Sequence, residues 1–193
     1  SLAASWSGED GGGSGTTLLT PDGGPIDAAH DAHHDSPADG AADALDATSF
    51  DGPTQLSETG LYSDILTRTL APGVAAYDVR FPLWSDGAAK QRYLALPAGT
   101  TIDTTLIDVW HFPVGPKAWK QFTKSGKLIE TRLLWKRTDG WLMSSYLWND
   151  AGTDAVAVPQ GQPDALGTNH DVPSAEQCQT CHNNVGDVLI GVA

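Results

Sequence analysis

Residues 128–148, with the sequence LIETRLLWKRTDGWLMSSYLW, decide the fold that we predict for this chain. In the first half, apolar or β-branched side chains alternate with charged ones, which places Ile129, Thr131, Leu133 and Trp135 on one face and Glu130, Arg132 and Lys136 on the other. A period of two is typical of a half-buried strand. Asp139-Gly140 is a strong hairpin turn, and residues 141–148 return as the partner strand. We therefore expect an antiparallel hairpin here.

Further strands are expected on both sides of this hairpin. Short runs rich in apolar and β-branched residues occupy 74–80, 91–96, 108–112, 119–123 and 155–158, and turn residues such as Asp86-Gly87 and Ser125-Gly126 separate them. Most of the seven tryptophans, including Trp119, Trp135 and Trp141, are expected to pack in the core. The pattern predicts a mainly β domain, an antiparallel meander or a sandwich-like arrangement.

The only two cysteines lie in the run Cys178-Gln179-Thr180-Cys181-His182. C-x-x-C-H is the attachment sequence of c-type haem, in which each thiol forms a thioether with one vinyl group and the histidine binds the iron. A redox dithiol would need a βαβ context, a zinc site would need a second ligand pair, and a structural disulfide is the third alternative. We predict one covalent haem c, held by Cys178 and Cys181, with His182 as the proximal ligand.

The residues before the motif predict a short helix. Ser174 is suited to cap its N-terminus, and Gln177 three positions later completes a capping box. The helix is expected to run from about residue 175 to residue 182 and to carry the haem. The predicted organisation is an extended acidic tail over 1–54, an antiparallel β domain over 55–172, and a haem-attachment segment over 173–193.

The formal net charge is −13 and is unevenly distributed. Residues 1–58 contain 11 of the 24 acidic residues and no Lys or Arg, and the tail is rich in Gly, Ala, Asp and Ser. Because no basic stripe is present, a nucleic-acid partner is not expected. No apolar run reaches the length of a membrane span. Bacteria attach haem covalently outside the cytoplasm, so we expect a periplasmic, cell-surface or extracellular location, with any leader already removed.

Several segments, taken in order, resemble a family. They are Phe81-Pro82-Leu83-Trp84-Ser85-Asp86-Gly87-Ala88, Phe112-Pro113-Val114-Gly115, Ile129-Glu130-Thr131-Arg132-Leu133-Leu134, Gly140-Trp141, Trp148-Asn149-Asp150-Ala151-Gly152-Thr153-Asp154-Ala155, and residues 172–182. Together they resemble a group of bacterial secreted c-type cytochromes in which a β-rich domain precedes a single C-x-x-C-H. The resemblance implies haem c and electron transfer. Members usually continue into a second cytochrome domain, which on this interpretation is absent here.

The sixth haem ligand is not apparent downstream of the motif, so the candidates lie upstream or on another molecule. Met143 is the only methionine, and a core position is its alternative role. His33 and His34 belong to a histidine-rich run in the tail, where a solvated patch is the alternative. His111 is expected in a strand, and His170 is expected to be exposed in a loop. A tail histidine that capped a neighbour's iron would link subunits into an oligomer or filament.

Three classes of function follow from these observations. The first is an extracytoplasmic monohaem cytochrome that transfers electrons between redox partner proteins and makes no bonds in a substrate. The second is a haem peroxidase-like enzyme with an open sixth position, although no distal acid–base pair is readable. The third is a structural fibre or binding module, in which the tail polymerises the β domain and the haem is secondary.

Overall fold

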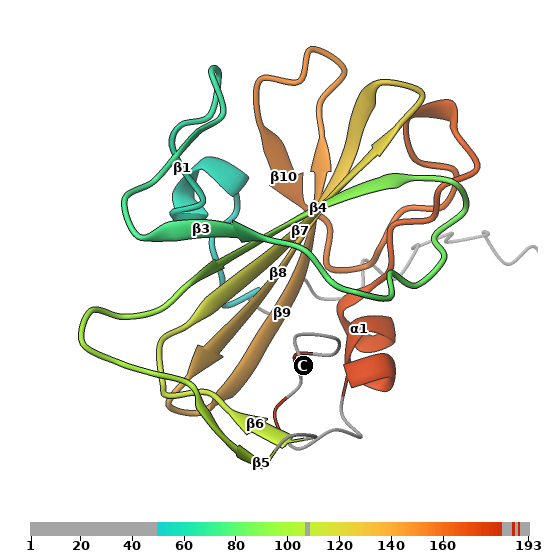
Figure 1. Cartoon of the computed structure of the whole chain (residues 1–193). Coiled ribbons are helices and arrows are strands. Elements are labelled where there is room, and N and C mark those ends of the chain that lie inside the picture. Colours follow the sequence, from blue (N-terminus) through green and yellow to red (C-terminus); the bar gives the residue numbers. More distant parts are fainter. Residues whose placement is uncertain (1–49, 107–108, 183–186, 188, 190–193) are drawn as a thin grey trace, which may run out of the picture. The chain divides into compact units, whose positions relative to one another are not determined.

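The structure, a computed structural model, describes residues 50–106, 109–182, 187 and 189. Its centre is a six-stranded antiparallel sheet with the order β10-β9-β8-β7-β4-β3 (Figure 1). The strands are β3 Val74–Tyr77, β4 Ala89–Ala95, β7 Lys117–Lys124, β8 Lys127–Arg137, β9 Gly140–Trp148 and β10 Ala155–Ala157. Neighbours in the sheet are neighbours in the chain except for a ribbon inserted between β4 and β7. The predicted antiparallel meander is therefore confirmed.

The predicted central hairpin is formed by β8 and β9. Arg137 pairs with Gly140 at the turn, and the pairing continues to Glu130 opposite Leu147. Gly140 has φ 136°, a backbone conformation that side-chain-bearing residues rarely adopt, which explains a glycine at this turn. β7 and β8 are joined at Ser125-Gly126, where both residues have positive φ.

The smaller elements complete the described chain. Two-stranded ribbons are formed by β1 Tyr62–Asp64 with β2 Thr69–Leu70, and by β5 Asp103–Leu106 with β6 Val109–His111. Two 3-10 turns, η1 Leu56–Thr59 and η2 Ala165–Gly167, lie in the connections, and α1 Ala175–His182 follows the sheet. The fold is mainly β with one short C-terminal helix, as predicted.

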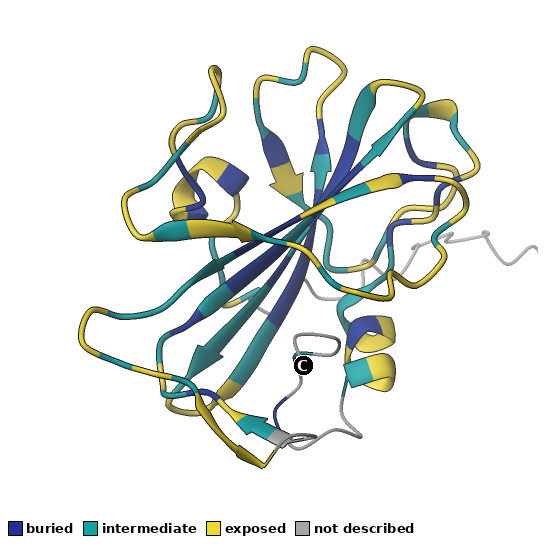
Figure 2. Cartoon of the chain, viewed as in Figure 1, coloured by how far each residue is buried: buried dark blue, intermediate teal, exposed yellow. Residues whose placement is uncertain are grey.

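Buried residues are frequent along the central strands of the sheet (Figure 2), and the main core cluster lies on one face of it. Trp119, Leu133 and Tyr146 pack there with η1 and the start of β1. The prediction that Trp119 is a core residue is confirmed, whereas Trp135 and Trp141 are only half-buried. The indole Nε1 of Trp119 donates to Thr59 Oγ1 over 3.1 Å, which satisfies its polar atom inside the apolar cluster.

The predicted faces of β8 need two corrections. The register with β7 shifts between Phe122 and Thr123, and this irregularity leaves Ile129 opposite no residue of β7. Ile129 packs with Ala165 and Val172, apart from the cluster that contains Leu133. Glu130, expected on a polar face, is fully buried. The alternation predicts which side chains share a face but not what covers that face. Residues distant in sequence cover the face that carries Glu130.

Candidate functional site

The motif helix begins where the sequence predicted. Gln177 N–H donates to Ser174 Oγ over 3.2 Å, and Ser174 N–H donates to Gln177 Oε1 over 2.9 Å, which is a complete capping box. Within α1, Cys178 is buried, Cys181 is exposed and His182 is half-buried. Residues three and four apart share a face of a helix, so Cys178, Cys181 and His182 lie together on one side.

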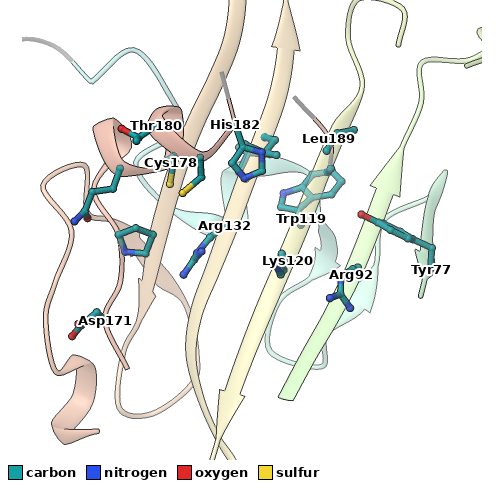
Figure 3. A pocket seen from close by; sticks show the side chains of 17 residues that line it. Tyr77, Arg92, Trp119, Lys120, Arg132, Asp171, Cys178, Thr180, His182 and Leu189 are labelled. Carbon is teal, nitrogen blue, oxygen red and sulfur yellow. The ribbon is translucent and has the colours of Figure 1, made fainter. Parts of the chain in front are cut away.

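A pocket of about 480 Å³ lies between α1 and the sheet, within the range of roughly 300–1,000 Å³ common for cofactor and ligand sites. The helix contributes all three motif residues, Cys178, Cys181 and His182, to its lining. Figure 3 shows the side chains of Cys178 and His182 reaching from the helix toward the strands. Apolar lining from Ala118, Leu134 and Leu189 suits a flat, largely apolar ligand.

The sheet wall of the pocket carries three cationic side chains in one row. Arg92 of β4 pairs with Lys120 of β7, which pairs with Arg132 of β8. Residues directly opposite in antiparallel strands project from the same face, and Figure 3 shows the three side by side across the strands. All three line the pocket, with Tyr77 beside Arg92 at the sheet edge. The row therefore faces the motif helix across the cavity.

A buried ionic chain anchors one end of this row. Glu130 accepts from Arg132 Nε and Nη2 at 2.6 and 3.0 Å, and its other contact joins Glu130 Oε2 to His170 Nε2 at 2.8 Å. Burial opposes ionisation of Glu130, but the hydrogen bonds from His170 and Arg132 outweigh it, so the pKa of this carboxyl lies below its usual value. Arg132 is thus held in a fixed position.

Both thiols are free in this structure, which therefore contains no disulfide between Cys178 and Cys181. Burial raises the pKa of the Cys178 thiol, which keeps it protonated at neutral pH. Among the described residues, no three His, Cys, Asp or Glu side chains gather into a metal-binding group, and a zinc half-site finds no second half there.

The candidates for a sixth ligand are dispersed. Met143 packs in a small cluster with Cys178, Leu134 and Trp141, close to one thiol but not among the residues that line the pocket. His33 and His34 lie outside the described residues. His111 is exposed on β6. The expectation for His170 was wrong, because it is 2% exposed, inserted beside Phe122 and bound to Glu130.

Asp187 is a buried anchor point beyond the motif helix. Its carboxylate accepts from Lys136 Nζ at 2.8 Å, from Trp141 Nε1 at 3.0 Å and from the backbone N–H of Phe112 at 2.6 Å. Leu189 then lines the pocket. Sequence analysis missed this anchor, and it missed the row of Arg92, Lys120 and Arg132. Arg132 lay on the predicted polar face of its strand, but the sequence did not predict the register that aligns it with Lys120 and Arg92.

Searches against protein-family models, curated proteins and solved structures each returned no match. No helix in the described part of the chain is long and apolar enough to cross a membrane.

Proposed function

We propose that this protein is an extracytoplasmic c-type cytochrome that carries one covalent haem and transfers electrons. The observation that carries the proposal is that Cys178, Cys181 and His182 together line one pocket. Two thiols and an imidazole on one helical face are the donor set that haem c requires. The cavity volume, its apolar walls and its cationic row fit a porphyrin with carboxylate side chains.

In this assignment Cys178 and Cys181 would hold the group through thioethers, and His182 would bind the iron. The haem would supply reversible one-electron chemistry. Ala118, Leu134 and Leu189 would give it apolar contacts in the pocket between α1 and the sheet. The row Arg92, Lys120 and Arg132 places positive charge beside the site. The resemblance to secreted cytochromes with a β-rich domain before one C-x-x-C-H supports the same function and an extracytoplasmic location.

The test is expression in a host with a c-type cytochrome maturation system, followed by intact mass and absorption spectra. We expect the mass of one haem above that of the polypeptide, retained after denaturation and acid–acetone extraction. The double substitution C178A/C181A should lose that mass. A Gln179→Ala variant, changed between the cysteines at an exposed residue that does not line the pocket, is the matched control and should keep it. A colourless wild-type protein of bare polypeptide mass refutes the proposal.

We further propose that the acidic tail links subunits, with His33 or His34 of one chain as sixth ligand in another. The histidine-rich run supports this proposal. Deletion of residues 1–50 is then expected to leave one covalent haem, abolish assembly in sedimentation experiments, and change the iron from low spin to high spin. A truncated protein that keeps its low-spin spectrum refutes tail ligation and leaves Met143 as the candidate.

A further inference from the structure

The row of Arg92, Lys120 and Arg132 brings three positive charges together on neighbouring strands of the pocket wall. Adjacent strands are about 4.8 Å apart, and like charges directly opposite one another destabilise a sheet. Such an arrangement is costly unless negative charge compensates it. What this wall binds therefore depends on how much negative charge the described residues place beside the three cations.

That compensation is uneven along the row. Arg132 is paired with buried Glu130 through two hydrogen bonds. Within the part of the chain that the structure describes, the carboxylate that Arg92 approaches is Asp78, at 3.6 Å, and the Asp78 side chain is 93% exposed, so water weakens this pair. Among the described residues, no carboxylate lies within ion-pair distance of Lys120, whose ammonium instead sits 5.4 Å from the centre of the Phe122 ring.

The electrostatic environment of Lys120 agrees with this uneven pairing. Burial, followed by the charges of Arg132, Arg92 and Lys90, lowers the pKa of Lys120 to about 8, and Glu130 opposes this only weakly. Asp171 also lines the pocket, but one of its oxygens accepts from the backbone N–H of Asp164 at 2.9 Å. At Arg92 and Lys120, the wall opposite the motif helix thus presents cationic groups without a buried carboxylate partner.

We infer that the Arg92–Lys120–Arg132 row is the carboxylate-binding side of the pocket, and that it holds the propionates of the haem attached at Cys178 and Cys181. This inference rests on the proposed function. Arg92 and Lys120 have no buried carboxylate partner and can therefore bind the propionates. Arg132 is held by Glu130, which His170 also contacts, and forms the rigid end of the row. A carboxylate held by charged donors satisfies the row and orients the group.

The row also sets the redox property of the site. Positive charge beside an iron centre disfavours the oxidised form, which carries one more positive charge than the reduced form. Loss of one cation from this half-buried wall is expected to change the ratio of oxidised to reduced protein at a fixed potential by about tenfold, which is 59 mV for a one-electron couple. The direction is toward a lower midpoint potential.

The experiment compares four holoproteins by spectroelectrochemistry: wild type, Lys120→Met, Lys120→Arg and Lys124→Met. Lys124 lies on the same strand but does not line the pocket, so it is the matched control. We expect Lys120→Met to lower the midpoint potential by about the tenfold equivalent and to shift the propionate bands in resonance Raman spectra. Lys120→Arg, which keeps the charge, and Lys124→Met should stay close to wild type.

Circular dichroism and thermal unfolding of the four holoproteins guard against a folding defect. If Lys120→Met loses the wild-type spectrum, Lys120→Gln takes its place, and the same lower midpoint potential is expected.

Three outcomes would overturn the inference that the row binds the propionates. The first is a midpoint potential in Lys120→Met equal to that of Lys124→Met. The second is loss of the low-spin spectrum in Lys120→Met alone, which would make Lys120 an iron ligand. The third is a potential that responds to inorganic phosphate at constant ionic strength in wild type but not in Lys120→Met, because the row would then bind a free anion. If all four proteins carry haem, these failures leave the proposed function intact; absence of haem in wild type removes both.

Discussion

Replacement of Glu130 by Gln is the sharpest test of how this fold holds its site. Glu130 is fully buried and joins Arg132 to His170 through three hydrogen bonds of 2.6 to 3.0 Å. Removal of one partner from a buried ion pair costs roughly 3–5 kcal/mol. Gln retains one acceptor oxygen, and the Arg132 side chain is 30% exposed and partly solvated. We therefore expect a loss of about 3 kcal/mol in the free energy of unfolding at pH 7.

Urea unfolding followed by tryptophan fluorescence measures this loss, provided that the slope with denaturant is unchanged. The folded-state pKa of Glu130 lies below its usual value of 4.5, so the carboxylate stabilises the fold above that pH. Its contribution disappears as the pH falls through the folded-state pKa. The difference between wild type and Glu130→Gln should accordingly shrink below about pH 4.5.

Asp150→Asn provides the control, because the pair of Asp150 with Lys127 is exposed, with side-chain exposures of 81% and 40%. Surface pairs contribute about 0–1 kcal/mol, so this variant should change stability little. The reasoning is refuted if Glu130→Gln loses less than about 1 kcal/mol at pH 7, or if its deficit is constant from neutral to acid pH.

Two further substitutions test the segment that positions the motif helix. Ser174→Ala removes the cap at the start of α1 and should cost about 1 kcal/mol, with faster amide exchange at Cys178. Gln179→Ala, at an exposed position of the same helix, should stay within about 0.5 kcal/mol of wild type, and equal effects would contradict the capping role. Gly161 has φ +78°, and a Cβ there would lie 2.7 Å from the backbone of Val172 and Ser174. Gly161→Ala should therefore cost about 2 kcal/mol or more in urea unfolding, whereas Gly126→Ala, with φ +79° and open space around it, should cost only about 1 kcal/mol, and a ranking in the opposite order would show that the contact is not limiting.

The most local signals in the chain predicted its elements well. The strand predicted from the pattern over 128–137, the Asp139-Gly140 turn and the capping box at Ser174 each depend on residues only a few positions apart, and each is present in the structure. Their preferences arise from backbone geometry and short-range hydrogen bonds. The bounds of the motif helix, residues 175 to 182, were correctly predicted for the same reason.

The predicted polar face of β8 failed for the opposite reason. Nothing near Glu130 in sequence indicates that His170, forty positions later, will cover it, or that a register shift beside Phe122 will turn Ile129 toward Val172. His170 looked like an exposed loop residue because its loop is rich in turn formers. Its burial is decided by how that loop folds back over the sheet.

The sequence by itself determined the six strands of the main sheet, the hairpin, the helix and the presence of a C-x-x-C-H motif, because neighbouring residues encode all of these, whereas the short strands β1, β2 and β5 were not predicted. Only the tertiary structure decided that Arg92, Lys120 and Arg132 stand in one row opposite Cys178, Cys181 and His182. Inter-strand register places residues from three separate strands at the same height, and it results from packing of the whole sheet. A slip of one residue would turn Lys120 to the other face, so the cationic wall exists only in the folded molecule.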